Sequence, residues 1–347
     1  MQIAGSKELT EQVLSQDLCT VCGACVGLCP YFKVHIGKLA KIFDCDLEKG
    51  RCYAHCPKTD VDFEQLAQAL FQQPYNGEPL GIYRRITAAK AGDKTGTGDF
   101  QNGGTVTALM TCALESGMVD GAVLMDSDGL LPTPKLVTRA EDVVKCASTK
   151  YMAAPAVSCL NEAATDGKTN LGFVGTACQL TGVAQMRLNP LEKADFVDPV
   201  NLTVGLFCTW ALDTRQLMDF LSTRVDLKTI TGMDVPPPPA EVFIVKTGET
   251  VVEIPLDEIR ALVPKGCGVC PDMTAEWADV SVGAFEGKTD WNTLIIRTEK
   301  GEQLVEKAVA GGYLVLDDFP AEGLEHLTLG AGNKKKRARD NVAKEEK

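Results

Sequence analysis

The chain has 347 residues, 45% hydrophobic and 24% charged, a composition typical of a soluble globular protein large enough for about two domains. Its 35 basic and 47 acidic residues give a net charge of -12, which argues against a nucleic acid partner. Charges interrupt residues 1–17, and no apolar run approaches the roughly 18 residues of a membrane helix. We therefore expect a cytoplasmic protein that does not insert into a membrane.

The N-terminal segment is rich in cysteine, with seven of the 14 cysteines before position 60. A reducing cytosol keeps thiols reduced, so metal binding explains this density better than disulfides do. The first four have the Cys-x2-Cys-x2-Cys-x3-Cys-Pro spacing of a bacterial ferredoxin loop: Cys19, Cys22, Cys25 and Cys29. The spacing predicts a 4Fe-4S cluster, with a zinc site or packing cysteines as the alternative interpretations.

A second group of N-terminal cysteines comprises Cys45, Cys52 and Cys56. It resembles the other half of a two-cluster ferredoxin, in which the last cysteine returns to complete the first cluster. We therefore assign the first cluster to Cys19, Cys22, Cys25 and Cys56. The second cluster then has only Cys29, Cys45 and Cys52. It is a 3Fe-4S cluster, or a 4Fe-4S cluster whose last ligand is Asp44, His55 or a residue from elsewhere.

The following elements predict a mixed domain. Apolar residues at helical spacing predict a helix over 60–73, and the turn-rich stretch after it places a domain boundary near 75–85. Helices then alternate with short buried strands over 121–125, 171–174 and 202–207, which indicates an α/β or α+β fold. The prolines at 236–239 form a connection, and a hairpin is expected from 242–245 and 250–254 around Thr247 and Gly248.

These elements divide the chain into three parts. Residues 1–80 are predicted to form a ferredoxin-like iron-sulfur module, and residues 81–330 a mixed α/β domain. Residues 331–347 include five basic residues between 334 and 339 and few apolar ones, so burial cannot offset the entropy lost on ordering. We expect a disordered charged tail there, or a segment that contacts an acidic partner subunit.

Five ordered motifs are similar to those of a known family. They are FQNGGTVTAL with ALESGMVDG (100–109 and 113–121), STKY (148–151), GTACQ (175–179), GLFC (205–208) and CGVCPDMTAEWADVSVG (267–283). Together they resemble the coenzyme F420 hydrogenase/dehydrogenase beta-subunit family, nearly to the C-terminus. Ala177 departs from the pattern, because the family usually has proline there. Members include beta subunits of F420-reducing hydrogenase and formate dehydrogenase and the plant hydroxymethyl chlorophyll reductase, and they bind FAD and at least one 4Fe-4S cluster.

The resemblance implies that the mixed domain binds FAD, through Asn102, Gly103, Gly104 and Thr105 and through Ser148, Lys150 and Tyr151. The first four open an apolar helix, whose N–H groups and positive end suit a phosphate or the polar edge of a flavin. An ordinary Gly-Gly turn is the alternative. In the second loop, Lys150 offers a charge and Tyr151 an aromatic face, with a solvated lysine beside a core tyrosine as the alternative.

The family motifs also contain four cysteines, and the resemblance implies that they hold one 4Fe-4S cluster: Cys178, Cys208, Cys267 and Cys270. Buried, unreactive cysteine is the alternative for each of them. Three cysteines then remain. Cys112 has the position of a packing residue on a helix, and Cys146 and Cys159 lack ligand spacing.

The predicted function is that of an electron-transfer subunit. FAD would exchange a hydride with F420, NAD(P)H or a similar carrier, and two or three clusters would carry single electrons. The partner would be a formate dehydrogenase, a hydrogenase or a heterodisulfide-reductase-like subunit of a larger complex. Two alternatives are a relay module with no hydride carrier and a ferredoxin-dependent reductase of an organic substrate. The sequence has no Walker A loop, catalytic triad motif or complete G-x-G-x-x-G fingerprint.

Overall fold

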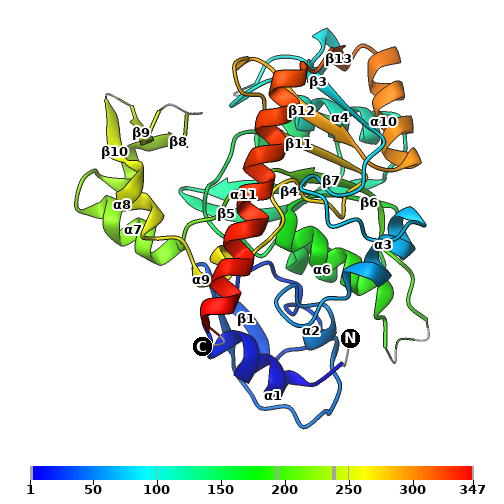
Figure 1. The fold of residues 1–347 in the computed structure, drawn as a ribbon, viewed down its shortest axis with the longest axis vertical. Helices are drawn as coiled ribbons and strands as arrows, with labels where there is room; N and C mark the ends of the chain where they lie inside the picture. Colours follow the sequence, from blue (N-terminus) through cyan, green and yellow to red (C-terminus); the bar gives the residue numbers. More distant parts are fainter. Residues whose placement is uncertain are drawn as a thin grey trace.

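The computed structural model describes residues 3–98, 100–191, 193, 195–236, 240–248 and 250–345. Its centre is an eight-stranded mixed sheet in the order β13-β3-β12-β11-β7-β6-β4-β5 (Figure 1). The strands are β3 (Arg85–Ala91), β4 (Gly121–Asp128), β5 (Leu131–Val137), β6 (Leu171–Thr176), β7 (Val200–Leu206), β11 (Val280–Ala284), β12 (Asn292–Ile296) and β13 (Leu314–Asp317). Strands β4, β6, β7 and β11 run parallel, and the outer pairs are antiparallel. The predicted mixed α/β fold and its three strands are confirmed.

Helices cover both faces of this sheet. Side chains alternate between the faces along a strand, so Ala122 and Leu124 belong to one core while Val123 belongs to the other. The first core contains α4 (Thr105–Glu115) and α10 (Glu299–Ala310), and the second contains α5 (Ala156–Thr165) and α6 (Ala177–Leu188). Two 3-10 helices, η2 (Asp93–Thr95) and η3 (Ala140–Cys146), contact α4.

A smaller lobe is built on a second sheet of β8 (Ile230–Asp234), β9 (Val242–Thr247) and β10 (Val251–Pro255). It has its own apolar core with α7 (Thr214–Ser222), η4 (Leu227–Thr229) and α8 (Leu256–Arg260) (Figure 1). The antiparallel pairing of β9 and β10 confirms the predicted hairpin. Residues 237–239 of the predicted proline connection lie outside the described residues.

The N-terminal segment folds around its cysteines at one end of the molecule (Figure 1). It consists of α1 (Ser6–Leu9), η1 (Thr10–Leu14), the β1 (Phe32–His35) and β2 (Lys38–Lys41) hairpin, and α2 (Arg51–Ala54). A small core of Leu9, Val13, Phe32 and Tyr53 packs against the cysteine side chains. The helix predicted over 60–73 is α3 (Phe63–Phe71), which begins where the Asp62 side chain accepts a hydrogen bond from Gln65 N.

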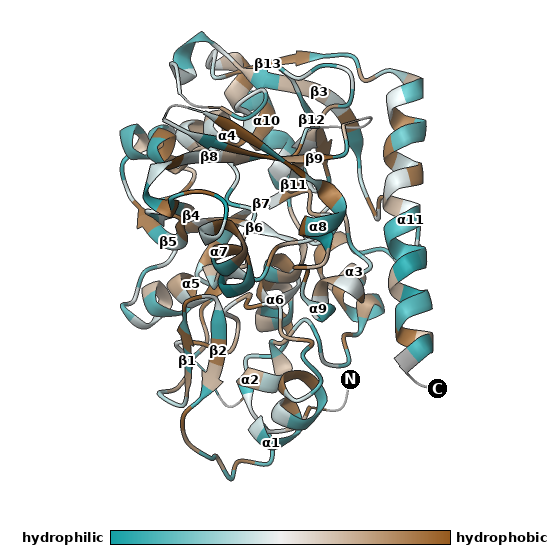
Figure 2. Cartoon of the chain, turned by 90° about the vertical axis from the view of Figure 1, so that its left-hand side faces the viewer, coloured by the Kyte–Doolittle hydropathy of each residue, from teal (hydrophilic) through white to brown (hydrophobic). Residues whose placement is uncertain are grey.

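The C-terminal residues form a helix, so the prediction of a disordered tail is wrong. Helix α11 (Ala321–Glu345) runs along the molecule towards the N-terminal segment (Figure 1), and its residues are largely hydrophilic (Figure 2). Lys334 and Lys335 are nevertheless buried, at 3% and 9% exposure. Lys334 donates to main-chain carbonyls and Lys335 pairs with the Glu276 carboxylate, so polar contacts as well as the buried Ala331 and Ala338 hold the helix on the core. Within the described ranges, no helix has the length and apolarity needed to cross a bilayer.

Candidate functional site

Two adjacent parallel strands each deliver a cysteine at their carboxyl end. Cys178 lies in the first turn of α6, directly after β6, and Cys208 follows β7. Helix α6 begins with a capping box in which Thr176 N donates to the Gln179 side chain at 2.8 Å. Open sheets of parallel strands bind ligands beyond these carboxyl ends. The topology therefore places both cysteines at a favourable edge for a bound group.

The second pair of core cysteines comes from a loop packed against the same edge. Cys267 lies in the short α9 (Lys265–Gly268), and Cys270 follows it. Cys208 N donates to the Met273 carbonyl at 2.8 Å, which holds this loop against the end of β7. All four motif cysteines consequently line one cavity, together with Thr20 and Lys334.

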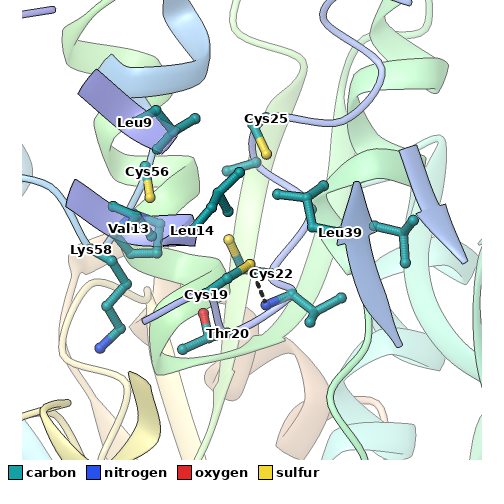
Figure 3. A pocket seen from close by; sticks show the side chains of 15 residues that line it. Leu9, Val13, Leu14, Cys19, Thr20, Cys22, Cys25, Leu39, Cys56 and Lys58 are labelled. Atoms are coloured by element: carbon teal, nitrogen blue, oxygen red, sulfur yellow. Dashed lines mark hydrogen bonds between the residues drawn. The ribbon is translucent and has the colours of Figure 1, made fainter. Parts of the chain in front are cut away.

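The cysteines predicted to hold the first N-terminal cluster line a second cavity. Figure 3 shows Cys19, Cys22, Cys25 and Cys56 around a space closed by apolar side chains, among them Leu9, Val13 and Leu39. Val21 N donates to Cys19 Sγ at 3.4 Å. Four thiols within an apolar wall, with a main-chain N–H directed at one sulfur, are the donor set that an iron-sulfur cluster uses.

The remaining three N-terminal cysteines also lie near one another. Burial, together with the Cys29 and Cys45 thiols, raises the pKa of Cys52 to about 11. The two residues suggested as a fourth ligand have other partners in this structure. His55 is buried with Nε2 at 3.0 Å from the Asn189 carbonyl, and Asp44 extends into solvent with a carboxylate oxygen 2.8 Å from Lys41 Nζ.

The two cavities meet at Thr20, which lines both of them. Its side chain is 6% exposed, and Oγ1 has no hydrogen-bond partner among the described residues. An unpaired buried hydroxyl is costly. A sulfur-rich group in either cavity would supply the missing acceptor, so the residues present fit an iron-sulfur cluster. Thr20 was not predictable from the sequence, because a threonine between two cysteines has no signal of its own.

The thiols are strongly affected by burial. It raises the pKa of Cys208 and of Cys56 to about 12 and that of Cys22 well above the ordinary thiol value. The Cys178 thiol contributes to the rise at Cys22, which places the two groups within electrostatic range. Such thiols become ligands only when a bound cation replaces their protons. In the described part of the chain, no three His, Cys, Asp or Glu side chains converge closely enough to bind a single metal ion.

The first predicted flavin loop lies at the start of α4. Gly104 has φ +71°, and a Cβ there would lie 2.6 Å from the Phe100 ring, while a Cβ on Gly103 would lie 3.0 Å from the Ala89 carbonyl. The Thr105 hydroxyl donates to the same carbonyl at 3.1 Å. Close packing on β3 therefore accounts for Gly103, while the positive φ and the Phe100 ring within the loop account for Gly104. Asn102 donates from its side chain to the Thr289 carbonyl at 3.3 Å.

The second predicted flavin loop lies beside the first. Gln101 donates to the Tyr151 hydroxyl at 2.5 Å and to Asp234 at 2.6 Å, which joins both loops to the small lobe. The Tyr151 ring packs edge-on against Phe243 in the core of that lobe. Lys150 donates to the Ser148 hydroxyl at 3.0 Å, and burial lowers its pKa. One ligand could thus contact both loops, and Gln101 is a neighbour that the sequence analysis did not identify.

The N-terminal segment is in close contact with the cysteine loop of the core. A Cβ on Gly266 would lie 2.1 Å from the Leu18 carbonyl oxygen and 3.1 Å from Thr20 Cγ2. Gly23, with φ +88°, approaches α5 similarly, since its Cβ would lie 2.7 Å from the Pro155 carbonyl oxygen. Only glycine permits these contacts. The two cysteine cavities therefore both depend on the packing of the N-terminal segment against the core.

We expect Gly266→Ala to lower the free energy of unfolding by about 1–3 kcal/mol, because the added methyl group must displace the main chain at Leu18. Urea unfolding followed by circular dichroism measures this change. Gly248→Ala is the matched control, since a Cβ at Gly248 meets no atom within 4 Å, and it should change stability by less than about 0.5 kcal/mol. Equal effects of the two variants would contradict the proposed contact.

A mixed sheet that brings four cysteines together beyond its parallel strands, next to a cysteine-rich N-terminal segment, has the architecture of an oxidoreductase. Comparison with known families identifies which one. Two models, for the N-terminal and the C-terminal part of the coenzyme F420 hydrogenase/dehydrogenase beta subunit, match residues 86–161 and 168–322 respectively. The chain belongs to the coenzyme F420 hydrogenase/dehydrogenase beta-subunit family, which confirms the resemblance found in its motifs.

Individual relatives agree with this assignment. The coenzyme F420 hydrogenase subunit beta of Methanothermobacter thermautotrophicus is 30% identical over 76% of this chain and 95% of its own. The coenzyme F420-dependent sulfite reductase of Methanocaldococcus jannaschii is 30% identical over 84% of this chain and 46% of its own. A chain in the F420-reducing [NiFe] hydrogenase complex from Methanosarcina barkeri superposes with a TM-score of 0.70 at 30% identity, covering 77% of this chain and 93% of that one. By their names, these relatives are a reductase and parts of hydrogenases, and this chain is an oxidoreductase of the same family.

Proposed function

We propose that the chain is an electron-transfer subunit with FAD and two or three iron-sulfur clusters. It exchanges a hydride with coenzyme F420, NAD(P)H or a similar carrier, and it relays single electrons to or from another subunit. The observation that carries the proposal is the presence of three cysteine groups. Two of them, the core group and the first N-terminal group, line cavities that share Thr20. When bound, FAD would exchange electron pairs with the carrier, and the clusters would take single electrons.

Different residues of the chain would bind the FAD and each cluster. The amino end of α4 and Lys150 offer positive charge to an anionic FAD between the two adjacent loops. Cys178, Cys208, Cys267 and Cys270 would hold the core cluster, and Cys19, Cys22, Cys25 and Cys56 would hold the next. Cys29, Cys45 and Cys52 would hold a third cluster of three or four irons, at the end of the series.

The proposed partner is another redox subunit, of a hydrogenase, a formate dehydrogenase or a heterodisulfide-reductase-like enzyme. Relatives support this choice, since they include the beta subunit of an F420 hydrogenase and one subunit of an F420H2 dehydrogenase. The net charge of -12 and the sequence composition support a cytoplasmic protein that does not bind nucleic acid.

The test is anaerobic stopped-flow absorbance on the FAD- and iron-loaded protein, mixed separately with reduced F420, NADH and NADPH. We expect one carrier to bleach the FAD first and the clusters afterwards. In Cys178→Ser, FAD reduction should persist while cluster reduction is lost, because Cys178 lines the core cavity and lies in electrostatic range of Cys22. Cys159→Ser is the control and should behave as the unaltered protein.

Other outcomes would replace this proposal. If the clusters of Cys178→Ser are reduced at the native rate, the flavin feeds the N-terminal module directly. If none of the three carriers reduces the FAD, the chain is a relay without a carrier. Turnover of an organic substrate by the isolated chain with reduced ferredoxin would identify it as a ferredoxin-dependent reductase.

A further inference from the structure

Helix α11 begins at the edge of the family-matched residues and carries one buried lysine to the core cysteines. Lys334 is 3% exposed and lines the same cavity as Cys178, Cys208, Cys267 and Cys270. Its Nζ donates to the Asp272 carbonyl at 2.8 Å and, through a short hydrogen bond, to the Cys208 carbonyl. A cationic side chain from the last helix is thus built into the wall of the proposed cluster site.

The hydrogen bonds of Lys334 do not neutralise it. The two carbonyl oxygens accept hydrogen bonds but carry no net charge, and a buried ammonium group costs several kcal/mol without an anion nearby. A buried lysine is usually neutralised by an ion pair. The next residue, Lys335, has one, since its Nζ lies 2.8 Å from the Glu276 carboxylate. Lys334 instead lines the cavity of the four core cysteines.

Three contacts fix the position of this charge. The Lys335 and Glu276 ion pair lies beside it, and Lys335 also donates to the Glu78 carbonyl at 2.6 Å. One to two turns further on, Asn341 donates from its side chain to the Gly268 carbonyl at 3.0 Å, between Cys267 and Cys270. A shift of helix α11 along the core would break these three contacts. They therefore hold Lys334 at a fixed position relative to the cysteine loop.

We propose that Lys334 is a positioning residue that raises the reduction potential of the cluster held by the four core cysteines. The inference rests on the proposed function, because it requires that cluster. An added electron increases the negative charge of the site, and a fixed ammonium group at its wall stabilises the reduced form more than the oxidised form. Low solvent access strengthens this interaction, since little water screens it.

The test is an anaerobic redox titration followed by EPR on the iron-loaded protein, in which the core signal is the one that Cys267→Ser removes. Lys334→Met should lower the reduced-to-oxidised ratio of that cluster at least tenfold at a given potential, a shift of about 59 mV for one electron. Lys334→Arg keeps the charge and should remain near the native potential. Lys336→Met is the matched control, since Lys336 is exposed on the same helix.

The outcomes separate the inference from the function on which it rests. If Cys267→Ser removes neither iron nor an EPR signal, the core cluster and the proposed function fail. If Lys334→Met retains the full iron content and the native potential, the cluster stands and the role of Lys334 is overturned. An equal shift in Lys336→Met would also overturn it. If Lys334→Met fails to retain iron, Lys334→Gln, which keeps a donor, replaces it, and a native potential there refutes the proposal.

Discussion

Replacing Cys267 by serine is expected to remove one whole cluster from the chain. The unaltered protein should bind about 11–12 iron atoms, from two 4Fe-4S clusters and one of three or four irons, and the variant should bind about 7–8. Cys267 lines the core cavity opposite the ends of β6 and β7, and a serine hydroxyl is a poor substitute for a thiolate ligand. Electron flow from FAD to an acceptor should stop in the same variant.

Iron analysis and visible absorbance under anaerobic conditions measure this effect. Cys112→Ala is the control, because Cys112 is fully buried in the apolar core beside α4 and lines neither of the two cysteine cavities in the described part of the chain. It should leave iron content and electron flow unchanged. Equal losses in both variants would refute the ligand assignment, and four or fewer irons in the unaltered protein would refute the three-cluster arrangement.

The second large effect is expected at Arg297, which is 2% exposed directly after β12. Its guanidinium donates to the Leu80 and Ile82 carbonyls at 2.8 and 2.9 Å, and to Ser281 Oγ at 2.8 Å. Further hydrogen bonds reach the carbonyl and hydroxyl of Thr274. Arg297→Met leaves these buried acceptors unpaired, so the free energy of unfolding should fall by about 3–5 kcal/mol.

Thermal and urea unfolding would measure the loss. Arg84→Met is the matched control, since Arg84 is half-exposed and forms a surface ion pair with Glu302 at 2.9 Å. Such a pair contributes at most about 1 kcal/mol. A similar small loss in Arg297→Met would mean that Arg297 does not tie residues 80–82 to the cysteine loop.

Much of the fold was predictable because local patterns agree with the tertiary structure. The apolar stretches at 121–125 and 171–174 became β4 and β6 since both faces of those strands are covered by helices. The cysteine sets could be grouped from ferredoxin spacing and from the family motifs, and the structure gathers the two four-cysteine sets around separate cavities. Their role as cluster ligands, and that of the two loops in FAD binding, stays a prediction.

The parts that could not be predicted depend on partners distant in sequence. The basic run at 334–339 has the composition of a solvated tail, yet Lys335 pairs with Glu276 and Lys334 reaches carbonyls beside the cysteines. Arg297 and Thr20 are similar cases, because a buried polar residue differs from a surface one only in its neighbours. Tyr151 matched a family motif, but its hydroxyl bonds to Gln101 and Asp234, which no local pattern links to it.

The wall of the core cavity contains both Thr20 and Lys334, which lie more than three hundred residues apart in the sequence. The ribosome synthesises the chain from its N-terminus, so Thr20 and the N-terminal cysteines are made long before Lys334. The wall of the core cavity can therefore be completed only after synthesis has passed Lys334. The cluster proposed for this cavity would then have to enter before α11 packs against the cysteine loop, or when that helix moves away from it.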